Sequence, residues 1–178
     1  MTVHIRPATP GDSADAVRVV RAVFDEYGFI WEPDGYHADL YDLEAHYLDR
    51  GHGFWVGIDG DGGVVGTVAL ERFAPLPGEP GEPITIDSVR RVGGCDCSLQ
   101  RLYVAPSARR DGAGTALLCA ALDGARSERR RLLEIWSDKR FADAHRLYER
   151  VGARTVAERI STDPDESAEW GLVLSLER

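Results

Sequence analysis

Long apolar runs, cysteine and lysine are all scarce in this sequence of 178 residues. No apolar run approaches the roughly 20 residues that a membrane-spanning helix needs, so we expect no membrane partner. Residues 1–6 lack the apolar stretch of a secretory signal, which leads us to expect a cytoplasmic location. Lysine occurs once, at Lys139, and we draw no function from that scarcity.

The three cysteines are Cys95, Cys97 and Cys119, an odd number that favours reduced thiols over a disulfide framework. Cys95 and Cys97, separated by Asp96, are residues of a type that could bind a metal ion, with histidines as further ligands. A C-x-C pattern without a second spaced pair is a weak signal, however, and we predict no metal site.

Positive charge is also in short supply, because 21 basic residues face 30 acidic ones and the formal net charge is −9. Phosphate binding requires a basic face, so we expect no nucleic-acid partner. The acidic balance instead favours cationic small molecules or basic peptides. With 43% hydrophobic and 29% charged residues, the composition is that of a globular protein. The length suits a single domain over residues 1–178.

Apolar periodicity and turn residues predict alternating strands and helices. A first helix begins at Asp12 or Ser13, as both can cap it, and ends at Gly28. We further predict helices over 37–48, 112–126 and 141–151, and strands over 3–6, 54–58, 64–72, 99–104, 132–137, 154–161 and 169–176. Residues 74–83 carry four prolines and read as a loop, while 84–86 are either a strand or part of an insertion. The order predicts an α/β class with a mixed (α+β) sheet in one layered domain.

The most informative stretch covers residues 102–115, where an apolar strand leads through Pro106 and two arginines to glycines that open a helix. The start of a helix has unpaired N–H groups and the positive end of a dipole, and it therefore binds anions. Gly112 and Gly114 leave room for a phosphate to approach the backbone, and Arg109 and Arg110 add positive charge. The pattern is neither a Walker loop nor G-x-G-x-x-G. It predicts a site for a phosphate-bearing ligand, with a glycine-containing turn and solvated arginines as the alternative.

Two motifs in this chain resemble the GNAT superfamily of N-acetyltransferases. Arg109-x-x-Gly112-x-Gly114, after Leu102-Tyr103-Val104-x-Pro106, is similar to the family's acetyl-CoA signature. Ala144-x-x-Leu147-Tyr148-x-x-x-Gly152 is similar to its later helix. The resemblance implies a GNAT-like acyl-CoA N-acyltransferase fold of about six to seven strands and about four helices, with a V-shaped splay between central strands.

The resemblance also implies residue roles. The backbone of Leu102, Tyr103 and Val104 pairs with the pantetheine and orients the thioester. The pyrophosphate is held by the amides of Arg109, Arg110, Asp111, Gly112, Ala113, Gly114 and Thr115. Tyr148 falls on the family's tyrosine that protonates the departing thiolate, although its spacing alone favours a core residue.

Two positions depart from the family pattern. Phe141 stands where many members have an asparagine, and Ala153 replaces the commoner aromatic residue. Neither change touches the pyrophosphate loop. No general base is assigned: Glu71, Gln100 and Glu134 lie on expected strands, and each also fits a surface or ion-paired role.

By the same resemblance, the acceptor site is built by the first two helices and their loop. The expected acceptor-binding residues are Glu26, Tyr27, Trp31 and Tyr36, a set of aromatic and acidic side chains that suits a cationic amine. The expected reaction moves an acetyl group from acetyl-CoA to a primary amine of a small molecule or peptide, by direct attack in a ternary complex. The alternative is a non-catalytic acyl-CoA-binding or sensing module of the same fold. Homodimers are common in the family, so a homodimer is possible here.

Overall fold

The computed structural model describes residues 3–177, and these divide into two compact units. The first unit comprises the chain up to Glu71 together with Arg101–Gly124. The second comprises Arg72–Gln100 together with the chain from Ala125 onward. Each unit is described by itself below.

Three elements contribute residues to both units: strand β3 (Val64–Arg72), strand β6 (Cys97–Val104) and helix α3 (Ala113–Ser127). Followed from neighbour to neighbour, the strands are hydrogen-bonded in the order β1-β2-β3-β6-β7-β9-β8. The predicted mixed α/β class with six to seven strands is therefore confirmed.

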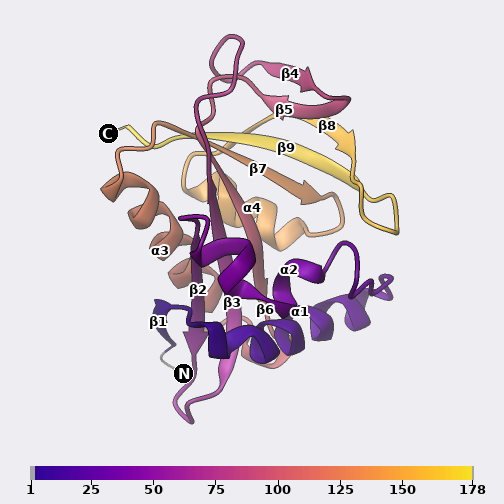
Figure 1. Ribbon diagram of the computed structural model, residues 1–178, viewed down its shortest axis with the longest axis vertical. Coiled ribbons are helices and arrows are strands. Elements are labelled where there is room, and N and C mark those ends of the chain that lie inside the picture. The colour runs from indigo at the N-terminus through magenta and orange to yellow at the C-terminus, as the bar shows by residue number, and fades with distance from the viewer. Residues whose placement is uncertain (1–2, 178) are drawn as a thin grey trace. The chain divides into compact units, whose positions relative to one another are not determined.

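The first unit contains antiparallel strands β1 (His4–Pro7), β2 (Gly53–Ile58) and β3 (Figure 1). Its fourth strand is the end of β6, where the Ala105 N–H donates to the Val65 carbonyl at 2.8 Å. A second bond runs from Thr67 Oγ1 to the Arg101 carbonyl at 2.7 Å. These bonds fix the end of β6 against β3.

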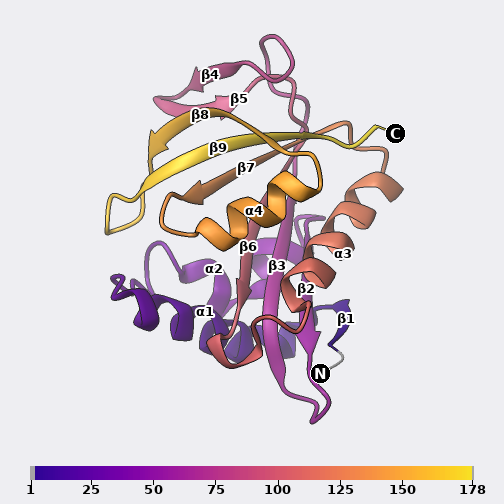
Figure 2. The same ribbon diagram turned by 180° about the vertical axis from the view of Figure 1, so that it is seen from behind.

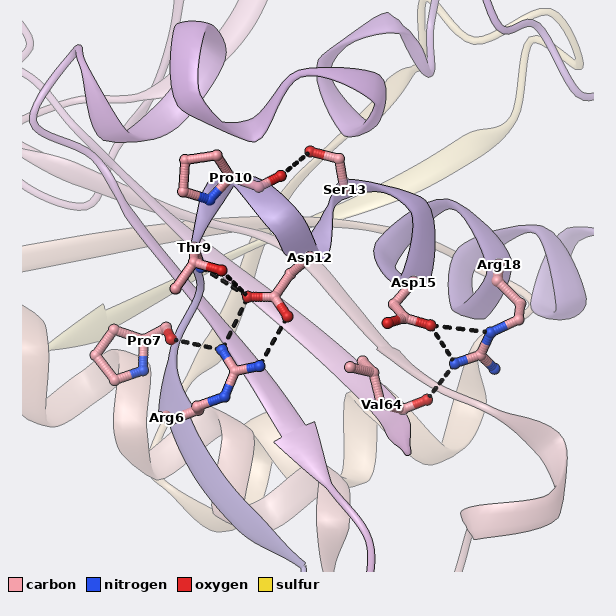
Figure 3. A network of polar contacts seen from close by, with 9 residues as sticks. All are labelled: Arg6, Pro7, Thr9, Pro10, Asp12, Ser13, Asp15, Arg18 and Val64. Atoms are coloured by element: carbon pink, nitrogen blue, oxygen red, sulfur yellow. Dashed lines mark hydrogen bonds and ion pairs between the residues drawn. The ribbon is translucent and has the colours of Figure 1, made fainter. Parts of the chain in front are cut away.

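Helix α1 (Ser13–Tyr27) packs its predicted apolar stripe into the core of the first unit and ends at the left-handed Gly28, φ 70°. Asp12 holds the cap position, but its carboxylate makes no bond to the helix start. It accepts hydrogen bonds from both Arg6 terminal nitrogens, at 2.8 and 2.7 Å, and from the Thr9 N–H at 2.7 Å (Figure 3). The residue predicted as a cap instead ties the helix to β1.

The single helix predicted over residues 37–48 is instead two pieces, α2 (Ala38–Tyr41) and a π-helical turn (Glu44–Leu48). The break falls at Asp42, whose extended backbone has φ −146° and ψ 80°. Its carboxylate accepts the Ala45 N–H at 3.0 Å and so starts the second piece anew. Leu40, Leu43 and Tyr47 remain buried on both sides of the break.

The second unit contains β7 (Leu132–Asp138), β8 (Arg154–Ile160) and β9 (Ala168–Ser175), with helix α4 (Ala142–Arg150) beside β7 in both views (Figures 1 and 2). β7 pairs antiparallel with β9, and β9 with β8. The first residues of β6 pair parallel with β7 in the register Cys97↔Leu133 to Leu99↔Ile135.

A separate two-stranded sheet, β4 (Pro83–Ile86) and β5 (Val89–Val92), follows the proline-rich loop. Residues 84–86, for which the sequence left a strand or an insertion open, therefore belong to a strand. The partner strand β5 was not predicted. Glu134 on β7 anchors this sheet, because its buried carboxylate accepts Arg91 Nε at 2.6 Å and the Val92 N–H at 2.8 Å.

Among the described helices, none is both long enough and apolar enough to span a membrane. Residues 3–177 contain no group of three or more histidine, cysteine or acidic side chains placed to hold a metal ion. Cys95 and Cys97 are buried free thiols, and Cys119 is exposed. Burial raises the pKa of Cys95 to about 12, so this thiol stays protonated at neutral pH.

Candidate active site

The loop between β6 and α3 has the exposed backbone that an anion site requires. A short 3₁₀ turn (Pro106–Ala108) leads into it, and Arg110, Asp111 and Gly112 are exposed. The Ala116 N–H donates to the Gly112 carbonyl at 2.9 Å, so the amides just before Ala116 have no partner within the helix. All the residues expected to hold a pyrophosphate therefore lie at or just before the start of α3.

Gly112 in this loop adopts a left-handed backbone, φ 83°. A β-carbon built at Gly112 would meet no heavy atom within 4 Å. The backbone conformation, rather than packing within the protein, is what requires a glycine here. The space that a side chain would take is open at the start of α3.

The Arg109 side chain in this loop has two hydrogen-bond partners. Its terminal nitrogens donate to the two Glu26 carboxylate oxygens at 2.9 and 2.6 Å. Its Nε donates to the Val104 carbonyl at 3.3 Å. Glu26, which we expected to bind the acceptor, is therefore engaged with the expected cofactor loop.

Two other expected acceptor residues, Trp31 and Tyr36, pack around His37 in the first unit. The Trp31 ring stacks on the His37 ring with centroids 3.8 Å apart, and the Tyr36 ring meets it edge-on at 5.0 Å. Trp31 Nε1 donates to the Tyr41 hydroxyl at 3.1 Å. Tyr27, the fourth expected residue, is 40% exposed. The structure thus brings Trp31 and Tyr36 together and leaves Tyr27 on the surface.

His37 is fully buried and has a defined protonation state. Its Nδ1 accepts the Glu32 N–H at 3.1 Å, which assigns the proton of the neutral ring to Nε2. Burial and the nearby Arg101 charge lower the pKa of His37 to about 4. The buried Nε2 has no hydrogen-bond partner among the described residues. At neutral pH this nitrogen is a donor, so it cannot accept a proton from an amine.

Sequence reasoning missed Arg101 and Tyr47, which meet at the carboxylate of Asp39. Arg101 donates to this carboxylate through Nε at 2.9 Å and through a terminal nitrogen at 2.6 Å. The Tyr47 hydroxyl donates to the same carboxylate. Desolvation is the largest single influence and lowers the pKa of Arg101, but the Asp39 charge and the neighbouring tyrosines together outweigh it, so the pKa is raised. The only signal in the sequence was a charged residue within an apolar strand.

In the second unit, Tyr148 lies on α4 and is 4% exposed. Burial raises the pKa of its hydroxyl, which keeps it protonated. Phe141 occupies the N-cap position of α4 without a side-chain capping hydrogen bond. Glu134 is bound to Arg91 and the Val92 N–H, as described above, which leaves it unsuited to act as a general base.

Comparison with solved structures gives the same fold. A GNAT-family acetyltransferase from Staphylococcus aureus Mu50 matches with a TM-score of 0.76 and 16% identity, over 99% of this chain and 100% of that chain. YncA from Salmonella typhimurium, solved with its cofactor acetyl-CoA, matches with a TM-score of 0.72 and 18% identity, over 100% and 96%. A phosphinothricin acetyltransferase from Sinorhizobium meliloti in complex with acetyl-CoA matches with a TM-score of 0.72 and 15% identity, over 98% and 89%.

No protein among curated sequences matches this chain. A model of the acetyltransferase (GNAT) family matches residues 18–153. This match includes the loop before α3 and the helix that carries Tyr148. Because it covers well over half of the 178 residues, the chain belongs to the GNAT family of acetyltransferases.

Proposed function

We propose that this protein transfers the acetyl group of acetyl-CoA to a primary amine. The observation that carries the proposal is the exposed start of α3, where the amides before Ala116 lack helical partners. A pyrophosphate is the kind of anion that such a helix start binds. Acetyl-CoA carries one, and two of the structural relatives were solved with acetyl-CoA.

The proposed reaction is a direct attack by a neutral amine on the thioester carbonyl. The nitrogen–carbon bond forms, the carbon–sulfur bond breaks, and the proton that the nitrogen loses passes to water. We propose that a backbone N–H within residues 102–104 stabilises the oxyanion, an effect worth roughly 3–4 kcal/mol for one donor. Tyr148 then gives its proton to the leaving thiolate, for which its buried, protonated hydroxyl is suited, and it regains a proton from water.

For the acceptor, we propose a small-molecule or peptide amine and expect the cationic class predicted from the net charge of −9. The local support comes from the exposed Tyr27 and Asp34. Glu26 adds nothing to it while it is bound to Arg109, and Asp39 is neutralised by Arg101. Polyamines, aminoglycosides and basic peptides should be screened against neutral amines, and faster acetylation of the neutral set would overturn the cationic assignment.

The cofactor site is tested by a charge placed at the start of α3. Thr115 is exposed in the first helical turn. Thr115→Glu adds a negative charge that the helix dipole tolerates but a pyrophosphate does not. We expect acetyl-CoA to bind this variant at least tenfold more weakly, about 1.4 kcal/mol, in calorimetric titration.

Thr115→Gln is the matched control, since it has the size of glutamate without its charge. We expect its acetyl-CoA affinity to stay within about threefold of the wild type. Equal acetyl-CoA affinity of the wild type and Thr115→Glu would show that acetyl-CoA does not bind at this loop. Failure of the folded wild type to bind acetyl-CoA would overturn the proposed function.

The role of Tyr148 is tested by Tyr148→Phe. Because the substitution removes a single buried oxygen atom and leaves the ring in place, we expect little change in Tm and in acetyl-CoA affinity. Loss of the proton donor should lower kcat by about 10- to 100-fold. An unchanged kcat would assign Tyr148 to the core alone, as its spacing also allowed.

A further inference from the structure

Arg101 has an unusual backbone for its place in the fold. Six non-glycine residues among those described are left-handed, and Arg101, φ 53°, is the one that lies inside a strand. This conformation is strained for a residue with a side chain. It persists only where surrounding contacts hold it, and a left-handed residue in a strand re-aims the residues that follow, as at a β-bulge.

Both the backbone carbonyl and the guanidinium of Arg101 make contacts that hold the residue in place. Its carbonyl accepts the Thr67 hydroxyl at 2.7 Å, which ties it to β3. Its guanidinium is bound in a bidentate pair to Asp39 and also donates to the Tyr36 carbonyl at 2.6 Å. The guanidinium also lies over the Tyr36 ring, 4.8 Å from the centroid. With the side chain only 10% exposed, solvent screens these contacts little.

Asp39 is in turn fixed by a contact that it does not share with Arg101. The Tyr47 hydroxyl donates to its Oδ2, so its carboxylate is bound on two sides. Tyr47 is buried against Phe54 of β2, with ring centroids 5.0 Å apart. The chain Arg101–Asp39–Tyr47 therefore runs from β6 through α2 to the core of the first unit.

Buried ion pairs are weak stabilisers, because desolvation offsets most of their attraction, and their best-attested use is to fix one arrangement. Arg101 immediately precedes Leu102, Tyr103 and Val104, whose backbone the proposed function assigns to the thioester. Tyr36 and Asp39 belong to the segment assigned to the acceptor. One buried pair thus joins the strand that meets the donor to the segment that meets the acceptor.

We propose that the Arg101–Asp39 pair is a positioning device that holds the left-handed turn in β6 and thereby orients the backbone of residues 102–104 toward the thioester. This inference rests on the proposed function. It makes Arg101 and Asp39 positioning residues, which touch neither reacting atom. If the pair had only a structural role, breaking it would change the stability of the protein and would not change the environment of the bound thioester carbonyl.

The test uses Arg101→Gly, Asp39→Asn and the control Asp12→Asn in the full chain. We call the Arg101–Asp39 pair the clamp. Glycine adopts φ 53° without strain, so Arg101→Gly removes the clamp and leaves the local backbone conformation accessible. Asp39→Asn keeps the size of the side chain and removes its charge. Asp12→Asn breaks another bidentate pair of the first unit, with Arg6, which lies outside the proposed machinery.

The first readout is the ¹³C chemical shift of the carbonyl of [1-¹³C]acetyl-CoA bound to each protein, which needs no acceptor. Amide hydrogen bonds polarise this carbonyl, so the wild type and Asp12→Asn should show the same displacement from the free ligand. We expect Arg101→Gly and Asp39→Asn to lose most of that displacement. Acetyl-CoA affinity should change less than about threefold, because the pyrophosphate loop is intact.

The second readout is kinetic, with an acceptor found in the screen. We expect kcat to fall about 10- to 100-fold in both clamp variants, with KM for acetyl-CoA nearly unchanged. The double variant should lose little more than either single one, since both break the same contact. Arg101→Lys, which keeps the charge but not the fork, should recover part of the loss.

The outcomes separate the two proposals. A wild type that does not bind acetyl-CoA overturns the proposed function, whatever the variants do. A wild type that binds it, with clamp variants that show a lower Tm but the wild-type carbonyl shift and kcat, overturns the positioning role alone. If Arg101→Gly fails to fold, Asp39→Asn and Arg101→Lys decide by the same readouts.

Discussion

Three polar side chains lie close together in the first unit, with His37 buried and Asp39 and Arg101 partly buried. Arg101 and Asp39 neutralise one another across two hydrogen bonds. His37 stays neutral, because burial and the Arg101 charge both oppose a second proton on its ring. The protonation state of His37 thus follows from what surrounds it, which its position in the sequence does not reveal.

His37 should make stability depend on pH in a defined window. Its pKa is about 4 in the folded protein, while an unfolded chain gives histidine its ordinary value of about 6.5. Between these values the unfolded state binds more protons, so stability falls as the pH is lowered. Asp39 and Glu32 oppose the shift without cancelling it. We expect His37 to account for a loss of about 2 kcal/mol from about pH 7 to about pH 4.5.

Urea unfolding of the wild type and His37→Asn at both pH values measures this loss. Asparagine does not titrate, yet its carbonyl can still accept the Glu32 N–H. The wild type should therefore lose more stability than the variant across the window, and equal losses would contradict the assignment. Asp12 does not interfere, because Arg6 lowers its pKa to about 2 and its contribution is lost below the window.

At the scale of elements, periodicity and turn residues predicted the strands and long helices to within a few residues. The helix over 37–48 failed at Asp42, because its side chain caps a new helical piece while the apolar spacing runs on across the break. β5 escaped prediction because its residues Val-Arg-Arg-Val carry little strand signal without their partner β4. Each miss was decided by contacts that the local pattern does not contain.

The candidate site divides in the same way. The loop over 109–115 was predictable, since a glycine-rich helix start shows in consecutive residues. The Arg101–Asp39 pair was not, because it joins residues 62 positions apart. Nor could the sequence reveal that Glu26 binds Arg109, 83 positions away. Features of the site that depend on contacts between polar side chains far apart in the sequence could be found only in the structure.

At the scale of the whole molecule, β3, β6 and α3 each pass from one unit to the other without interruption. Neither unit is therefore one continuous stretch of chain. We predict that both units unfold together, as one domain over residues 1–178. Scanning calorimetry should show a single transition whose calorimetric and van't Hoff enthalpies agree. Two resolved transitions, or a calorimetric enthalpy well above the van't Hoff value, would contradict the single-domain prediction.

The scarcity of lysine acquires a meaning once the family is known. An acetyltransferase works in the presence of its own donor, and every exposed lysine on its surface is a rival to the true acceptor. This chain has only Lys139, whose Nζ is bound to Glu158 at 2.6 Å and lies 3.8 Å from the centroid of the Trp170 ring. Self-acetylation on a lysine side chain is thereby confined to Lys139, so acetyl-lysine at any other site in an assay with a protein acceptor belongs to that acceptor.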